Sequence, residues 1–132
     1  MEELEKLRKE IDKLDKMIAE LISKRQRLSN KILKAKGGMF TYDPVRERKV
    51  MEKIFSYDID SKLAERIWRQ IIAFNLSKQK KLKIGHLGND KFSLAAYESY
   101  FGPYFEIIDF KNVTKLIEGI NNKIIDAAII EK

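Results

Sequence analysis

The stretch that decides the fold is residues 2–36, EELEKLRKEIDKLDKMIAELISKRQRLSNKILKAK, because its apolar residues recur in alternating steps of three and four. That spacing places side chains on one face of an α-helix. The apolar positions are Leu4, Leu7, Ile11, Leu14, Ile18, Leu21, Leu28, Ile32 and Ala35. One position of the series is not apolar, and Arg25 occupies it. The sequence therefore predicts a long helix with an arginine on its apolar face.

This helix contains neither glycine nor proline until Gly37 and Gly38, which lack a Cβ and can take the left-handed conformation that ends a helix. At about 1.5 Å per residue it would be on the order of 50 Å long, more than a chain of this size can cover. An apolar face of that length needs a partner chain. We therefore expect a homodimer.

Composition limits the classes of protein to which the chain can belong. The 132 residues are 44% apolar, enough for a folded core, and include no cysteine and a single histidine, His86. These counts exclude disulfides and thiol catalysis and argue against a zinc site. No apolar run approaches the roughly 20 residues of a membrane span, and the charged start MEELEKLRKEIDK is unlike a signal peptide. We expect a cytoplasmic protein.

The net charge of +7 favours an anionic partner. A nucleic acid, an acidic membrane face and a small polyanionic metabolite all satisfy it. Lysines gather between residues 78 and 83, and a solvated linker explains them as well as a nucleic-acid patch does. Charge alone does not distinguish these partners.

Two shorter helices are predicted after the glycine pair. Asp43, followed by a proline, is a typical helix start, because the aspartate accepts backbone N–H bonds and proline suits the first turn. This second helix runs to about Tyr57. Either Asp58 or Asp60 caps a third helix, which continues to about Lys80 and has an apolar face of its own.

Beyond residue 82 the pattern changes to short apolar runs that alternate with amphipathic stretches. IGHLG, YFEIIDF and KIIDAAII are typical of strands, and KFSLAAYESYF and VTKLIEGIN of helices. This βαβαβ order predicts a parallel sheet with helices packed on it. We expect a mainly α protein with a helical domain at residues 1–81 and an α/β segment at residues 82–132.

Polar residues on the apolar faces are candidates for a binding site. A guanidinium at Arg25 costs several kcal/mol of desolvation unless a carboxylate meets it, and that carboxylate belongs either to another helix or to a bound anion. On the third helix, steps of four lead from Ile67 and Ile71 to Asn75 and Gln79. Either the last two line a pocket, or the helix leaves the core there and they are solvated.

Further polar residues stand at helix ends. Lys36 closes the first helix, where a cation is favourable in any case. Arg46 and Glu47 lie in the first turn of the second helix, where the helix dipole favours Asp43 and Glu47 but not a cation. Cations, an amide pair and a carboxylate at the ends and seams of a helical bundle predict a pocket for a compact di-anion with hydroxyl or ether oxygens.

Residues 1 to about 81 resemble the all-helical, dimeric class of chorismate mutase, whose members convert chorismate to prephenate. The resemblance rests on LRKEIDKLDKMIAELISKRQRLSNKILKAK, DPVRERKVMEKI and RIWRQIIAFNLSKQ, which follow one another in the family's order. It implies a three-helix protomer in an intertwined dimer, with chorismate and prephenate as ligands and neither nucleic acid nor membrane as partner. It also implies a pericyclic rearrangement that needs no nucleophile, general base, metal or organic cofactor.

The resemblance also assigns substrate-binding residues. Arg25 and Arg46 match arginines that bind the two carboxylates of the substrate. Arg8, in KLRKEID, matches an arginine that reaches the site of the other protomer. Asn75 is expected to assist, although the family commonly has a smaller polar residue such as serine there.

The remaining matches act on the oxygens of the substrate. Lys36 and Gln79 match groups that hydrogen-bond the ether oxygen, and Glu47 with the Asp43 backbone matches the site of the ring hydroxyl. Such a site holds the folded, diaxial conformer and stabilises the charge that develops on the ether oxygen as the C–O bond breaks.

The C-terminal segment resembles the opening of a prephenate dehydratase domain, which some bacteria fuse behind such a mutase. KIGHLGNDKFSLAAYESYFG and LIEGINNKIIDAAIIEK carry this likeness, with Lys91 where the family's loop has a second glycine. The family's catalytic Thr-Arg-Phe region and regulatory domain come further along than Lys132. The sequence therefore predicts no dehydratase activity, and it leaves open whether the segment folds or responds to phenylalanine.

Two other functions stay open from the sequence. A non-catalytic, basic helical module that binds nucleic acid would show an affinity that falls steeply with salt, but it gives no reason for Asn75 and Gln79 to continue the apolar face. A regulatory relative would bind an anion and use the C-terminal segment to sense an aromatic amino acid.

Overall fold

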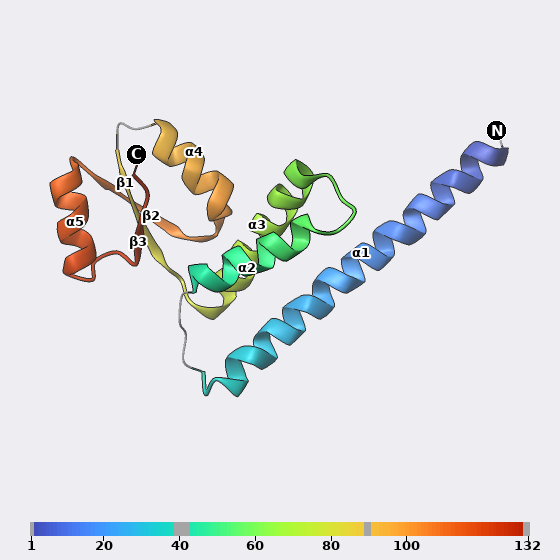
Figure 1. Cartoon of the computed structure of the whole chain (residues 1–132), viewed down its shortest axis with the longest axis horizontal. Coiled ribbons are helices and arrows are strands. Elements are labelled where there is room, and N and C mark those ends of the chain that lie inside the picture. The colour runs from blue at the N-terminus through green and yellow to red at the C-terminus, as the bar shows by residue number, and fades with distance from the viewer. Residues whose placement is uncertain (1, 39–42, 89–90, 131–132) are drawn as a thin grey trace. The chain divides into compact units, whose positions relative to one another are not determined.

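The computed structural model describes residues 2–38, 43–88 and 91–130 (Figure 1). Contacts divide the chain into two compact units, Met1–Phe40 and Thr41–Lys132. The helices and strands follow the chain in the order α1 (Glu2–Ala35), α2 (Pro44–Phe55), α3 (Ser61–Gln79), β1 (Lys83–Leu87), α4 (Lys91–Tyr100), a 3₁₀ turn η1 (Gly102–Tyr104), β2 (Glu106–Phe110), α5 (Val113–Asn121) and β3 (Ala127–Ala128). The mainly α content and the C-terminal βαβαβ order are thus confirmed.

Helix α1 forms the first unit and ends as its sequence predicts. Gly37 and Gly38 have φ angles of 73° and 76°, and their N–H groups donate to the carbonyls of Lys34 and Leu33. This paired arrangement satisfies carbonyls that the end of a helix leaves free. No residue of α1, which the structure describes in full, is buried, and its apolar stripe is exposed along the whole helix.

Helices α2 and α3 begin at aspartate caps in the second unit. Asp43 accepts a hydrogen bond from the Arg46 N–H, and Asp60 accepts one from the Leu63 N–H, each at 2.9 Å. Of the two candidate caps for the third helix, Asp60 is therefore the one used. Met51 and Ile54 of α2 and Ala64 and Ala73 of α3 are buried. The unit that contains these helices also contains the C-terminal strands, and the predicted domain boundary at 81/82 stays a prediction.

The three strands form a parallel sheet in the order β2-β1-β3. Helices α4 and α5 lie on opposite faces of this sheet (Figure 1), as right-handed crossovers in opposite directions require. Helix α5 approaches β1 closely, because a Cβ at Gly85 would lie 2.8 Å from Leu116 Cδ1 of this helix. It would also lie 2.5 Å from Ile125 Cδ1, in the segment between α5 and β3. The two faces of the sheet are thus covered from within the segment.

Strand β3 is shorter than the predicted strand at 123–130. Lys123 has a φ of 59°, and its N–H and that of Ile124 donate to the carbonyls of Ile120 and Gly119. These residues complete the end of α5 in the same paired arrangement that ends α1. The strand therefore begins only after the helix cap.

The C-terminal segment folds and packs against α3. The rings of Phe74 in α3 and Tyr104 in η1 meet edge to face at 5.6 Å. A Cβ at Gly102, whose φ is 62°, would lie 2.9 Å from the Gln70 side-chain oxygen, so this turn and α3 are in close contact. Among the described residues, no helix is both long and apolar enough to cross a membrane.

Candidate active site

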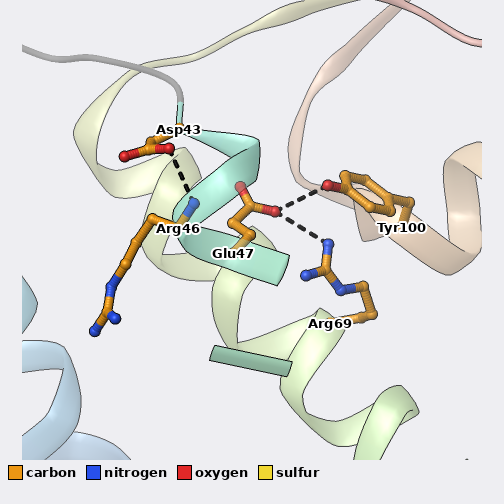
Figure 2. A network of polar contacts seen from close by, with 5 residues as sticks. All are labelled: Asp43, Arg46, Glu47, Arg69 and Tyr100. Carbon is orange, nitrogen blue, oxygen red and sulfur yellow. Dashed lines mark hydrogen bonds and ion pairs between the residues drawn. The ribbon is translucent and has the colours of Figure 1, made fainter. Parts of the chain in front are cut away.

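The start of α2 brings three of the predicted site residues together. Asp43 caps the helix with its side chain, Arg46 supplies the capped N–H, and the Glu47 N–H donates to the Asp43 carbonyl at 3.2 Å. Pro44 occupies the first turn, where its missing N–H leaves no bond unmade. The Arg46 side chain extends away from the Glu47 carboxylate (Figure 2). The first turn of α2 therefore fixes the backbone that carries the side chains of Arg46 and Glu47.

The Glu47 carboxylate is held by donors from two other helices. Its Oε1 accepts a bond of 3.0 Å from the Arg69 guanidinium in α3 and a bond of 3.0 Å from the Tyr100 hydroxyl in α4 (Figure 2). The side chains of Arg69 and Glu47 are only 9% and 12% exposed. Since a buried charge is stable only when it is paired and hydrogen-bonded, these contacts explain how Glu47 stays inside.

Arg69 and Tyr100 also contact each other. The guanidinium carbon of Arg69 lies 4.3 Å from the centre of the Tyr100 ring, a cation–π arrangement that fixes the plane of the guanidinium. The Tyr100 ring in turn packs edge to face on Phe101 at 4.7 Å. Glu47, Arg69 and Tyr100 thus form a three-helix cluster in which each side chain is held by the other two.

Both hydrogen bonds within the cluster are accepted by the same oxygen of the Glu47 carboxylate, Oε1. Among the described residues, none donates a hydrogen bond to Glu47 Oε2. In Figure 2 that oxygen points away from Arg69 and Tyr100. Glu47 is therefore anchored through Oε1 and presents Oε2 as an acceptor.

A cavity of about 340 Å³ is lined by residues of α2, α3 and α4. Arg69 and Tyr100 form part of its wall, together with Met51, Phe55 and Glu65. None of the eight site residues predicted from the sequence lines it.

On α3 the predicted positions differ in burial. Asn75 is buried, at 7% exposed, and Gln79 is half-buried. Asn75 stands four residues after Ile71, and its burial agrees with the pattern of steps of four. The alternative in which Asn75 is solvated at the helix end is wrong.

Three predicted residues belong to the first compact unit and are described only within that unit. Arg8 forms an exposed ion pair with Glu5 at 3.1 Å, and Arg25 is half-buried. Lys36 follows the last residue of α1, and its N–H donates to the Ile32 carbonyl at 3.0 Å. Their roles, like those of the other five residues, stay predictions.

Sequence reasoning did not single out Arg69 or Tyr100. Arg69 had a signal that could have been used: it stands four residues before the buried Ala73 in RIWRQIIAFN, just as Arg25 interrupts the face of α1. Tyr100 had no such signal, because only the tertiary fold brings α4 to Glu47. Within the described ranges, no group of three or more His, Asp or Glu side chains is arranged to hold a metal.

Comparison with known proteins matches residues 7–80 to the family described as chorismate mutase type II. Among curated proteins, the bifunctional chorismate mutase/prephenate dehydratase of Aquifex aeolicus is 36% identical over 112 residues, which is 77% of this chain and 31% of that protein. The proteins of the same name from Stutzerimonas stutzeri and Pseudomonas aeruginosa are each 30% identical over 112 residues, 76% of this chain and 31% of theirs. No solved structure matches the chain.

The chain spans about a third of the length of these relatives. The matched share of this chain is larger than residues 1–81 can supply, so the similarity reaches into the C-terminal α/β segment.

Proposed function

Because the chain belongs to the chorismate mutase type II family, we propose that it catalyses the rearrangement of chorismate to prephenate, a step of aromatic amino-acid biosynthesis. One observation carries the proposal furthest. The segment Asp43-Pro-Val-Arg46-Glu47 forms the first turn of α2, and there it holds a carboxylate inside the protein with one oxygen available. A ring hydroxyl is a natural partner for that oxygen.

The substrate is a di-anion, and the proposed site is rich in cations. Arg25 and Arg46 bind its two carboxylates, and the buried amide of Asn75 donates a further bond. Guanidinium groups suit this task because they meet a carboxylate with two parallel N–H donors and stay charged at any physiological pH. These contacts select the folded conformer in which the reacting carbons lie close together.

The reaction itself needs no nucleophile and no proton transfer. As the C–O bond breaks, negative charge gathers on the ether oxygen, and Lys36 and Gln79 donate hydrogen bonds to it. Interactions that strengthen as this charge develops lower the barrier, whereas equal binding of substrate and transition state would not. Glu47 Oε2 and the Asp43 backbone hold the ring hydroxyl and orient the ring.

We propose that the active protein is a homodimer. The apolar stripe of α1 is exposed from Leu4 to Ile32, and pairing with a second copy would remove it from water. In such a dimer Arg8 would serve the site of the other protomer, as the family resemblance implies. Neither a nucleic acid nor a membrane is needed as a partner, and the compartment stays the cytoplasm predicted from the sequence.

The test is to add chorismate to the purified chain, without metal or cofactor, and to follow the loss of chorismate absorbance. We expect the wild type to accelerate the reaction and the Arg25→Ala variant to lose that acceleration while keeping its helical circular dichroism. Arg27→Ala is the matched control, because Arg27 lies exposed on the same helix and has no assigned role. No acceleration by the wild type would refute the proposed function, and equal losses in both variants would refute the role of Arg25.

A further inference from the structure

Among the side chains that the structure describes, the Tyr100 hydroxyl is the group of α4, a helix of the C-terminal segment, that hydrogen-bonds a residue of the proposed site. It donates to Glu47 Oε1 at 3.0 Å, the same oxygen that accepts from Arg69. The residues come from α2, α3 and α4, and Tyr100 stands 53 positions after Glu47 in the chain. The carboxylate is thus fixed by an element that lies outside the region of the family match, residues 7–80.

A single donor would not fix the direction of Glu47. With one bond to Oε1, the carboxylate could still rotate about its last side-chain torsion, which is broad and has no sharp minima. The second bond arrives from a different helix, so the two together define the plane of the carboxylate. The plane decides where Oε2 points, and Oε2 is the oxygen left for the substrate.

The Tyr100 ring itself has other supports. It packs on Phe101 and lies under the Arg69 guanidinium at 4.3 Å. A phenylalanine would keep both contacts and lose only the hydroxyl. The hydrogen bond can therefore be removed without emptying space between α3 and α4.

From these contacts we infer that Tyr100 and Arg69 are positioning residues of the mutase site, and that the C-terminal α/β segment completes this site through the Tyr100 hydroxyl. The inference rests on the proposed function, because it gives Glu47 a substrate hydroxyl to bind. It adds that the helical part of the chain does not hold Glu47 in its working orientation alone. Tyr100 does not touch the substrate; it acts through the carboxylate.

The experiment measures kcat and KM for chorismate with the full chain and three variants: Tyr100→Phe, Glu47→Ala and the double variant. Tyr100→Phe is expected to lower kcat/KM about tenfold, the usual effect of one lost hydrogen bond to a charged group. Most of the loss should be in KM, because no charge develops on the ring hydroxyl during the reaction. Glu47 therefore binds this hydroxyl equally in the substrate and in the transition state. In the Glu47→Ala background, Tyr100→Phe should have no further effect.

Tyr97→Phe is the matched control. Tyr97 is a buried tyrosine of the same helix, and its hydroxyl donates to the Phe105 carbonyl at 2.6 Å. Its removal takes away a bond of similar geometry that lies wholly within the C-terminal segment, so the thermal midpoint should fall while kcat and KM stay at wild-type values.

The outcomes separate the two claims. An active wild type, with a Tyr100→Phe loss that disappears when Glu47 is absent, supports the inference. An active wild type with unchanged Tyr100→Phe kinetics, or with the same loss in both backgrounds or in Tyr97→Phe, overturns the inference and leaves the mutase proposal standing. An inactive wild type overturns the mutase proposal and, with it, the role given to Tyr100.

Discussion

Replacing Arg69 by methionine removes the charge but keeps most of the length of the side chain, so it tests how strongly the Glu47 cluster stabilises the second unit. The ion pair is nearly buried, with side chains 9% and 12% exposed. Removing one partner of a buried pair typically costs about 3–5 kcal/mol, because the other charge is left without its counter-ion. The Tyr100 hydroxyl still donates to Glu47, so we expect a loss near the lower end, about 3 kcal/mol.

Urea unfolding followed by circular dichroism measures this loss at a fixed protein concentration, since the proposed dimer would make the midpoint depend on concentration. The thermal midpoint should fall by about 10 °C. Glu47→Gln combined with Arg69→Met should be more stable than Arg69→Met alone, because no unpaired charge is left inside.

Lys115→Met is the control for this experiment. Lys115 pairs with Glu118 at 3.5 Å on the surface of α5, with both side chains more than half exposed. We expect a change within about 0.5 kcal/mol, because exposed pairs are solvated and screened. A loss for Arg69→Met no larger than that of this control would refute the reasoning that the pair is buried and stabilising.

Three further changes test other parts of the structure. If each site combines Arg25 of one chain with the partner's Arg8, the Arg8→Ala and Arg25→Ala variants should each be inactive. An equal mixture of the two, unfolded and refolded together, should regain about a quarter of wild-type activity, because half of the dimers hold one intact site of two. A mixture as inactive as its parents would contradict the shared site. Lys123→Gly should raise the free energy of unfolding by about 1 kcal/mol, since Lys123 has a φ of 59°, which glycine adopts without strain. A lower free energy of unfolding for this variant on urea titration would contradict this reasoning. Gly85→Ala should destabilise by about 1–3 kcal/mol, because its Cβ would lie 2.5 Å from a buried side-chain atom, whereas Gly88→Ala, with its nearest contact at 3.4 Å, should change stability little in the same titration.

Local patterns predicted the elements of this chain well. The apolar stripe on α1, its glycine end and the aspartate cap of α2 depend on neighbours within a few residues. These features can therefore be predicted from the local sequence. The same holds for the βαβαβ order. The limits of β3 could not be predicted, because Lys123 takes a left-handed conformation that glycine usually adopts, and the end of α5 thereby extends into the expected strand.

The candidate site divides in the same way. Asp43, Arg46 and Glu47 lie within five consecutive residues, and their placement on one turn followed from the helix start. The partners of Glu47 could not be found from spacing, because Arg69 and Tyr100 are 22 and 53 residues away and meet it only through tertiary packing. Long-range pairs of this kind require the fold.

The shared oxygen of Glu47 has a consequence for the genetics of such chains. A substitution at Tyr100 lies in the α/β segment by position, but its expected effect falls on a reaction assigned to the helices. A screen for mutase defects would therefore return changes beyond residue 81, and a division of the chain into two independent parts at that boundary would leave these changes unexplained. Residues 47 and 100 should accordingly be exchanged together when segments from two relatives are recombined.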